Sequence, residues 1–313
     1  MNHLWLHVRL LTVALIWGLS WTAGRLVATD FPPVTAAWIR YVIAIGLFLV
    51  WLKSTGNMRI PTKQEWKRLA YIGFFSTFLY QVFFMFGMKY TAAGDASLMI
   101  TFNPIITALL AIPFLGEKMT KRLASGLILA LSGVLIIFIY SPNVDIPATT
   151  RMLGDALIIL AALAWASSSI LMKKAMTTST SDSTEPLSPL QLTVWASIVG
   201  FFILTPWSAY ELIDTGMPTF NQDIVLSILF LAVFSTVISY VWFAEGIQTI
   251  GANRAALYVY LVPPFGILSG WWLLDEQLGL SLIAAFVLIV GGVAIAQSEK
   301  HDESEPSGIS HGD

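Results

Sequence analysis

Ten long apolar runs, separated by short turns or charged segments, occupy most of the chain. Each has about 18 residues or more, the length that an α-helix needs to cross the hydrocarbon core of a bilayer. The runs are apolar on all sides, unlike the short alternating strands of a membrane barrel. The predicted spans are Val8–Val27, Val34–Leu52, Leu69–Met88, Ala93–Leu115, Leu123–Tyr140, Leu153–Met172, Leu190–Tyr210, Ile224–Ile247, Ala252–Leu274 and Leu280–Ala296. The sequence therefore predicts an all-α integral membrane protein with ten transmembrane helices in a lipid bilayer.

The composition excludes several other classes of protein. Hydrophobic residues make up 56% of the 313 residues and charged residues only 12%. A soluble domain has roughly 25% charged residues, so this chain has too little polar surface for a soluble globular enzyme. The absence of cysteine removes disulfides, thiolate metal sites and thiol nucleophiles. No basic stripe offers a surface for nucleic acid, and no feature predicts a cofactor or a metal ion.

The positions of Lys and Arg predict the orientation of the chain. With the N-terminus in the cytoplasm, 13 of the 17 basic residues fall on the cytoplasmic side, three fall outside, and Arg40 lies within a span. Because cytoplasmic loops carry an excess of Lys and Arg, we expect both termini to be cytoplasmic. The membrane that we expect is the plasma (inner) membrane of a prokaryote. A second span follows the first almost at once, so we do not expect the first run to be a cleaved signal.

Three polar segments lie between or after the spans. Thr177–Pro189, rich in Ser, Thr and Pro, predicts a flexible cytoplasmic loop, and residues 298–313 predict a disordered, acidic cytoplasmic tail. The segment Ile60–Arg68 fits either a short helix on the lipid headgroups or a solvated loop, and we favour the loop.

Matching motifs recur in the two halves of the chain at nearly constant spacing. A shift of 159 residues aligns Phe75-Ser76-Thr77 with Phe234-Ser235-Thr236, Pro104 with Pro263, and Gly116-Glu117 with Asp275-Glu276; nearer the start, a shift of 148 aligns Trp17 with Trp165. The two predicted repeats cover residues 8–140 and 152–297, with five spans each. Because five is odd, the second repeat must enter the membrane inverted. Inverted repeats are typical of secondary transporters, in which two similar halves open a central site to either side in turn.

Several of these motifs resemble those of one transporter family. They are Trp17-Gly18, Pro33 with Arg40, Pro104 with Gly116-Glu117, and Pro263 with Asp275-Glu276. From about Leu11 to Ala296 the chain resembles the EamA type of the drug/metabolite transporter superfamily. The resemblance implies a ten-helix bundle that moves small metabolites, often amino acids or drug-like compounds, and often outward. The chain departs from the family pattern at two positions. The second half has Ser197 where the first half has Arg40, and Glu245 stands where an apolar residue is usual.

Two charged residues inside predicted spans are candidates for function, because a charge within a span normally faces the interior of the bundle. Arg40 could hold a substrate anion such as a carboxylate, or could reach the nearby outer surface beside Tyr41. Glu245 could exchange a proton or bind a substrate amine. Pairing of Glu245 with Arg254 or Lys53 at the cytoplasmic interface is the simpler interpretation.

Aromatic side chains with polar tips recur near the middle of the spans. Such rings suit a pocket for an amphipathic metabolite, and they equally suit packing. Asn103 is a further candidate because the proline that follows it frees a backbone carbonyl one turn earlier. The expected substrate-binding residues are Trp17, Trp21, Arg40, Tyr80, Gln81, Asn103, Trp165, Tyr240 and Tyr260. We favour Trp17 and Trp165 among the aromatics, because they are central and equivalent in the two repeats.

Other residues have structural interpretations. Two prolines are expected to kink their helices, and two glutamates to lie in tight turns. These residues are Pro104, Pro263, Glu117 and Glu276. Small residues along the fifth and tenth spans, such as Gly126 and Gly292, predict close helix packing within each half.

The sequence offers little for catalysis. Its four histidines lie in the predicted tails, and no span contains a histidine, a cysteine or two carboxylates, so serine chemistry and metal sites lack parts. A nucleotide-binding Gly-x-x-x-x-Gly-Lys loop is also missing. We predict a secondary transporter, not an enzyme, for a small amino-acid-like or drug-like metabolite, with export as the direction that the resemblance implies. The alternatives are an uptake carrier, a channel, or a scaffold or sensor without transport. The sequence does not distinguish a monomer from a homodimer.

Overall fold

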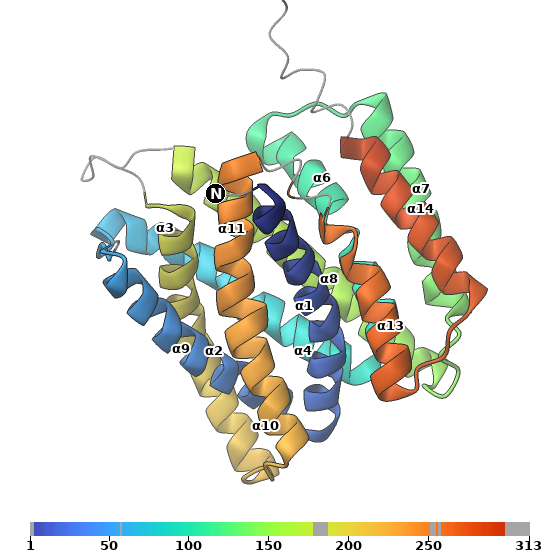
Figure 1. The fold of residues 1–313 in the computed structure, drawn as a ribbon, viewed down its shortest axis with the longest axis horizontal. Helices are drawn as coiled ribbons and strands as arrows, with labels where there is room; N and C mark the ends of the chain where they lie inside the picture. Colours follow the sequence, from blue (N-terminus) through green and yellow to red (C-terminus); the bar gives the residue numbers. More distant parts are fainter. Residues whose placement is uncertain (1–2, 57, 178–186, 251–254, 256–257, 298–313) are drawn as a thin grey trace, which may run out of the picture.

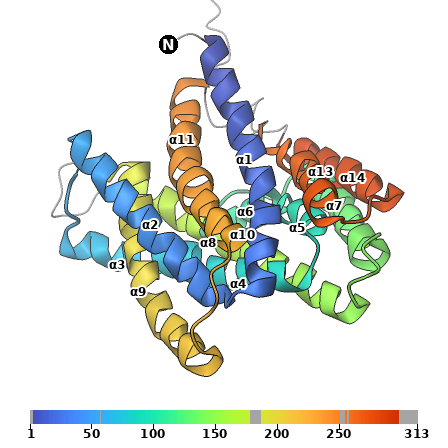
Figure 2. The same ribbon diagram turned by 60° about the horizontal axis from the view of Figure 1, so that its bottom comes forward.

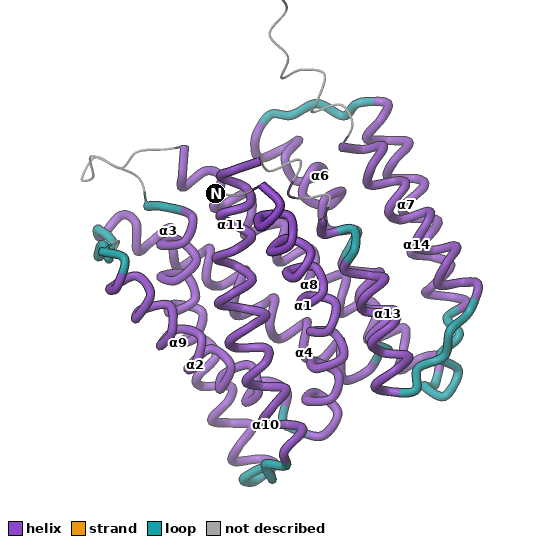
Figure 3. Tube along the Cα trace, viewed as in Figure 1, coloured by secondary structure: helices purple, strands orange, loops and turns teal. Residues whose placement is uncertain are grey.

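The computed structural model describes residues 3–56, 58–177, 187–250, 255 and 258–297. Within these ranges every regular element is a helix, and the helices pack into one bundle (Figure 1, Figure 3). Eight helical runs in them are long and apolar enough to cross a membrane, and one of these, Ala93–Leu115, includes the short turn between two helices. Two shorter apolar helices, Val262–Leu274 and Leu280–Ala296, occupy the positions of the last two predicted spans. The predicted tail after residue 297 and most of the predicted Thr177–Pro189 loop lie outside the described residues.

The helices follow the order of the predicted spans. Up to residue 140 they are α1 (His3–Asp30), α2 (Pro33–Ser54), α3 (Lys63–Gly73), η1 (Phe74–Leu79), α4 (Tyr80–Tyr90), α5 (Ala93–Ile100), α6 (Asn103–Leu115) and α7 (Lys121–Tyr140). Beyond it they are α8 (Ala148–Thr177), α9 (Pro189–Thr215), α10 (Gln222–Leu229), η2 (Phe230–Ile238), α11 (Ser239–Ile250), α13 (Val262–Leu274) and α14 (Leu280–Gln297).

Local sequence explains where α3 begins. The Thr62 side chain accepts a hydrogen bond from the Glu65 backbone, and the Glu65 side chain accepts one from the Thr62 backbone. This capping box satisfies amides that a helix start leaves without partners. The expected solvated loop over Ile60–Arg68 is therefore wrong from Lys63 onward. Its basic residues lie in the first turns of one helical run, Lys63–Tyr90.

Two π-helices, η1 and η2, interrupt the bundle at matching places. They contain the repeated triplets, Phe75-Ser76-Thr77 in η1 and Phe234-Ser235-Thr236 in η2. In η2 the Thr236 hydroxyl donates to the Leu231 carbonyl, five residues earlier, at 2.8 Å. π-Helical segments are rare and concentrate at functional sites. The triplets therefore mark positions in the bundle where backbone geometry departs from the ordinary helix.

The two repeated prolines begin helices instead of kinking them. Helix α5 ends at Ile100, and α6 begins at Asn103 with Pro104 in its first turn. Likewise, α13 begins at Val262 with Pro263 in its first turn. Proline fits there because its missing N–H would have no partner within the helix. The expected kinks are therefore wrong in form: each proline starts a new helix after a break.

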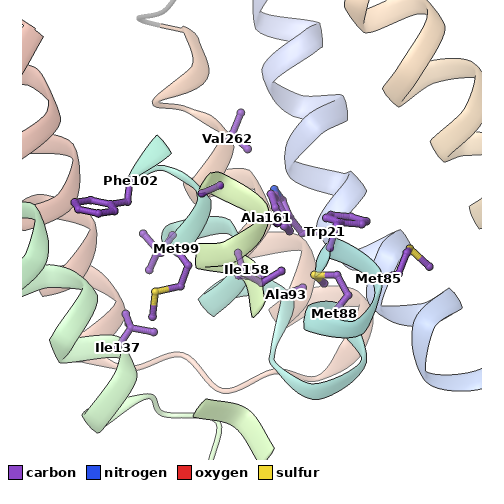
Figure 4. Packing of buried hydrophobic residues seen from close by; sticks show 14 of the residues in the cluster. Trp21, Met85, Met88, Ala93, Met99, Phe102, Ile137, Ile158, Ala161 and Val262 are labelled. Carbon is purple, nitrogen blue, oxygen red and sulfur yellow. The ribbon is translucent and has the colours of Figure 1, made fainter. Parts of the chain in front are cut away.

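The largest hydrophobic core lies where α1, α4, α5, α8 and α13 meet. Figure 4 shows Trp21, Met85 and Met88 on one side of this core, with Met99 and Phe102 further along it. Small residues such as Ala161 let the helices approach one another closely. In a bilayer such packing is a main source of helix association, because lipid tails are as apolar as the side chains.

Helices α7 and α14 lie side by side along one edge of the bundle (Figure 1, Figure 2). Gly126 and Gly292 face each other at this contact, and a Cβ atom on Gly292 would lie 2.6 Å from the Ala130 amide nitrogen. The expected packing of small residues within each half is therefore wrong. The two small faces pack against each other and join the end of the first half to the end of the second.

Gly292→Ala is expected to lower the thermal midpoint of the detergent-solubilised protein by several degrees, because the added methyl group would push α7 and α14 apart. Overpacking of this kind costs about 1–3 kcal/mol, and about 2–4 °C per kcal/mol is typical at this size. The neighbouring Gly291→Ala is the control, since a Cβ atom there meets only Leu129, at 3.8 Å. Equal midpoints for the two variants would contradict the backbone contact.

Candidate functional site

Arg40 lies two turns into α2, with its guanidinium buried inside the bundle and only 6% of the residue exposed. Its Nε and Nη2 atoms donate to the Thr236 hydroxyl of η2, at 3.0 and 2.8 Å, and Nη1 donates to Gln81 Oε1 of α4 at 3.4 Å. Gln81 Nε2 in turn donates to the Tyr41 hydroxyl at 3.3 Å. The guanidinium thus points inward and does not reach the surface beside Tyr41.

The groups that hold Arg40 are all neutral. Among the residues that the structure describes, no carboxylate lies within 4.0 Å of the Arg40 guanidinium. A charge removed from water is normally balanced by an opposite charge or a full set of hydrogen bonds. The planar fork of a guanidinium matches the two oxygens of a carboxylate. Arg40 is therefore chemically suited to bind an anion.

Four aromatic side chains, here called the ring cluster, form a chain of contacts between four helices. Trp17 of α1 meets Tyr240 of α11 edge-on, with 6.4 Å between ring centroids. Tyr240 lies 6.1 Å from Trp165 of α8, which lies 5.2 Å from Tyr80 of α4. All four side chains remain partly exposed, and Tyr80 and Tyr240 lie where the π-helices η1 and η2 pass into α4 and α11. Tyr80 is the neighbour of Gln81 in α4, and Tyr240 follows Thr236 by four residues, so two of the rings lie beside the partners of Arg40.

The structure thus brings six of the nine expected binding residues into one region: Trp17, Arg40, Tyr80, Gln81, Trp165 and Tyr240. The sequence analysis missed the contribution of η2 to this region. Trp17 Nε1 donates to the Ser235 carbonyl at 3.1 Å, and Thr236 holds Arg40. The sequence signal for this contribution is the polar Ser-Thr pair that recurs inside two apolar spans.

Trp17→Phe is expected to lower stability modestly, because it keeps an aromatic ring but leaves the Ser235 carbonyl without its donor. A hydrogen bond of this kind contributes about 0.5–1.5 kcal/mol, or a few degrees in the thermal midpoint. The control is Trp272→Phe, at a residue that is 76% exposed. Equal shifts for both variants would show that the Trp17–Ser235 hydrogen bond contributes nothing.

The other three expected binding residues have different partners. Trp21 is 5% exposed and packs on Phe84, with 5.2 Å between ring centroids. Asn103 Nδ2 donates to the Ala162 carbonyl at 2.8 Å and so joins the start of α6 to α8. Tyr260 lies just before α13 and packs against the main core.

Glu245 lies near the end of α11 that is predicted to be cytoplasmic. It forms an ion pair with Arg9 of α1, with 2.6 Å between Oε2 and Nη1, and its side chain is 39% exposed. The expected pairing with Lys53 is wrong, and Arg254 lies outside the described residues. His7, expected in a tail, lies in α1, and its Nδ1 atom is hydrogen-bonded to the Tyr258 hydroxyl.

A buried ionic cluster, Asp95, Arg151 and Asp155, lies at the predicted outer end. Arg151 Nη1 is 2.9 Å from Asp155 Oδ2 and 3.7 Å from Asp95 Oδ2. Its two Nη atoms also donate to the last carbonyls of α7, at Ile137 and Phe138, at 2.9 and 2.8 Å. Asp95 also accepts hydrogen bonds from the Ser141 hydroxyl and the Asn143 side-chain amide. Asp155 accepts one from the Thr91 hydroxyl. The sequence analysis missed this cluster because its two carboxylates come from different spans.

The two repeated glutamates lie at opposite ends of the bundle. Glu276, just after α13, accepts hydrogen bonds from the amides of Ala93 and Gly94 at 2.6 and 2.9 Å, and so caps α5. Burial raises the pKa of the Glu276 carboxyl, while these two amides and the Arg25 charge act in the opposite direction. Glu117, just after α6, pairs with Lys173 of α8 at 3.3 Å.

A cleft of about 390 Å³ opens at the predicted outer end, apart from the ring cluster. Its lining residues are Thr29, Asp30, Phe31, Pro32, Pro33, Phe86, Lys89, Trp207, Tyr210, Glu211, Asp214 and Thr215. Glu211 caps α2 there, accepting from the Thr35 amide at 2.7 Å and the Val34 amide at 3.3 Å. In the part of the chain that the structure describes, no group of three His, Asp or Glu side chains is arranged to hold a metal ion.

Comparison with known proteins places this arrangement in a family. Residues 4–139 and 152–297 match the EamA-like transporter family. The chain belongs to the EamA-like transporter family. The uncharacterized transporter YyaM of Bacillus subtilis (strain 168) is 24% identical to this EamA-like chain, over 99% of it and 100% of YyaM. A "Probable amino-acid metabolite efflux pump" of Escherichia coli (strain K12) is 28% identical, over 90% of this chain and 91% of the pump.

A solved crystal structure, whose description names no activity, superposes on this EamA-like protein with a TM-score of 0.60 at 16% identity. The likeness covers 95% of this chain and 98% of the other, and at this identity it shows the fold alone. The family and its apolar helices make this a multi-pass membrane protein, and the transporter relatives point away from an enzyme.

Proposed function

We propose that this EamA-like protein is a secondary transporter that exports a small amino-acid-like metabolite by alternating access. Arg40 binds the substrate carboxylate, and the ring cluster holds the remainder of the molecule. The observation that carries this proposal is the buried guanidinium in a neutral cradle beside four partly exposed rings. The efflux pump among the relatives supports the amino-acid class and the outward direction.

Alternating access requires two halves that can exchange roles, and we propose ten spans in two inverted repeats, with both termini in the cytoplasm of a prokaryote. Three paired features support the repeats: a π-helix on each Phe-Ser-Thr triplet, a helix start at each repeated proline, and a left-handed residue after α6 and after α13. The left-handed residues are Gly116 and Asp275, with φ of 74° and 54°. The proposed partners are the small-molecule substrate and the lipid bilayer, and the protein acts as a monomer or a homodimer.

The test is metabolite profiling of cells that make the parent protein or a Trp17→Ala, Arg40→Ala variant present in the membrane at the same level. We expect one class of carboxylate-bearing compounds to accumulate in the medium only with the parent protein. Depletion of a compound from the medium would instead indicate an uptake carrier. Identical profiles would contradict the proposed site and favour a scaffold or sensor.

A channel is separated from a carrier by the concentration dependence of transport. Once the substrate class is known, purified protein in liposomes should show saturation and counterflow, in which excess unlabelled substrate on one side drives labelled substrate against its gradient. Flux that rises linearly with concentration and shows no counterflow would indicate a channel.

A further inference from the structure

Two residues connect four helical segments at the predicted outer end of the bundle. Arg25 of α1 lies 3.7 Å from Glu276, through Nε and Oε1, and it donates to the carbonyls of Met88 and Thr91 at the end of α4. Glu276 also caps the first turn of α5. One ion pair thereby holds α1, α4, α5 and the turn after α13 together.

The internal repeat gives this ion pair a counterpart. The shift of 148 that aligns Trp17 with Trp165 also aligns Arg25 with Lys173, and the shift of 159 aligns Glu117 with Glu276. Lys173 and Glu117 form an ion pair of their own, at 3.3 Å. The match of Glu117 with Glu276 is part of the repeat itself, but the shift of 148 is set by Trp17 and Trp165. The recurrence of a basic partner, Arg25 in one half and Lys173 in the other, is therefore a separate observation.

The two pairs lie at opposite ends of the bundle. Lys173 is 22 residues after Arg151 on α8, a distance of about 33 Å at 1.5 Å per residue. Arg151 belongs to the same end as Arg25, because the buried ionic cluster contacts both the α4–α5 junction and the start of α8. The predicted topology therefore assigns Arg25–Glu276 to the outer end and Lys173–Glu117 to the cytoplasmic end.

The surroundings of the two pairs differ sharply. The side chains of Arg25 and Glu276 are 18% and 10% exposed, whereas those of Lys173 and Glu117 are 54% and 34% exposed. A solvated ion pair contributes little, about 0–1 kcal/mol, because water competes for both charges. A shielded pair that also accepts amide hydrogen bonds holds its helices more firmly.

Beneath the outer pair the bundle is closed by small residues. The hydroxyls of Thr22 on α1 and Ser269 on α13 are 2.7 Å apart, and both residues are buried. Ser97 of α5 is fully buried and packs against Gly266 of α13. Along α1 the order is Trp17, Thr22, Arg25, so this layer of buried residues separates the ring cluster from the outer pair.

We propose that the Arg25–Glu276 and Lys173–Glu117 pairs are matching latches at the two ends of the transport pathway, and that the Arg25–Glu276 latch is closed in this structure. The proposal rests on the alternating access of the proposed function. In the opposite state, the Lys173–Glu117 pair is shielded and holds α6 and α8 together more firmly. The Arg25–Glu276 pair is then hydrated, and α1 and α13 move apart. Each latch lowers the free energy of one closed end only.

The absence of cysteine gives a direct test. A Ser269→Cys reporter, nearly isosteric with the parent, is labelled in intact cells by a membrane-impermeant maleimide added outside. We expect slow labelling in the parent background and about tenfold faster labelling after Glu276→Gln, which removes a charge but keeps the side-chain shape. Arg25→Gln should act in the same direction and provides a second route if the first variant does not reach the membrane.

Two controls separate a latch from general loosening. Glu117→Gln removes the equivalent charge at the opposite end and should not accelerate labelling of Cys at position 269. Glu211→Gln also removes a buried, helix-capping carboxylate at the outer end, but one that joins α2 to α9. It should leave the labelling rate within about twofold of the parent, because α1 and α13 are not involved.

Unchanged labelling after both Glu276→Gln and Arg25→Gln would overturn the latch, as would equal acceleration by Glu211→Gln. Acceleration only from the cytoplasmic side, in inverted vesicles, would overturn the assignment of this pair to the outer end. The readout requires no substrate. If the Arg40→Ala variant exports as well as the parent while Glu276→Gln still accelerates labelling, the proposed role of Arg40 fails and the latch stands.

Discussion

Arg40→Lys is expected to reduce transport of a carboxylate substrate by about 10- to 100-fold, and Arg40→Ala by at least as much. A lysine keeps the positive charge but presents a single ammonium group, which cannot form the parallel hydrogen bonds of a guanidinium with a carboxylate. Lysine also cannot span Thr236 and Gln81 in the same way, so the cradle loses its fixed geometry. A charge-assisted hydrogen bond contributes about 1.5–3 kcal/mol, which corresponds to this range of rates.

The measurement is counterflow of a labelled amino acid in liposomes, compared with the amine that lacks its carboxylate. The parent should strongly prefer the amino acid, and both Arg40 variants should lose this preference. Arg59→Lys is the matched control, since Arg59 lies near the start of α3, paired with Glu65, and is remote from the ring cluster. Full transport of the amino acid by both Arg40 variants would exclude the carboxylate-binding role.

Much of the fold could be predicted from the sequence because the bilayer imposes a simple rule. Every backbone polar group in lipid must be satisfied within its own segment, so a long apolar run becomes a helix. The predicted span Ala93–Leu115 has the limits of the observed helical run, and α7 extends its prediction by only two residues. Helix ends were missed where polar residues continue the helix beyond the apolar run, as they do at Lys63.

The neighbours of the helices could not be predicted in the same way. Composition shows that Gly126 and Gly292 allow close approach, but not which helix approaches, and the contact between α7 and α14 crosses the two halves. The same limit explains the partner of Glu245. Arg9 is 236 residues away in sequence, and only the packing of α1 against α11 brings the two side chains together.

In the candidate site, the prediction succeeded where one residue was unusual for its own span. Arg40 is a charge in an apolar run, and Trp17 and Trp165 are equivalent positions in the repeat. The prediction failed where a contact depends on backbone geometry, as with the Ser235 carbonyl. It also failed for charges that are not unusual when each helix is taken by itself. Asp95 lies in the first turn of α5, where an acid is unremarkable, and Asp155 is a single acid two turns into α8. Only the structure places both beside Arg151.

Arg151→Met is expected to destabilise the protein more than any other variant considered. It leaves Asp155 and Asp95 buried without their cation, and leaves the last carbonyls of α7 without their donor. Removing one partner of a buried ion pair costs about 3–5 kcal/mol, which corresponds to a fall on the order of 10 °C in the thermal midpoint. The midpoint is measured by thermal unfolding in detergent, with Lys89→Met as the control because Lys89 is an exposed cation at the same end.

The double variant Arg151→Met, Asp155→Leu distinguishes a buried ionic cluster from simple loss of packing. Asp155 and Arg151 share one network, so their effects should not add. When Asp155 is replaced as well, only Asp95 is left as a buried carboxylate without its cation. The double variant should therefore be clearly more stable than the summed losses of the two single variants predict. Additive losses would mean that each side chain acts independently. A midpoint for Arg151→Met close to that of Lys89→Met would mean that the arginine is not needed to balance charge at this end of the bundle.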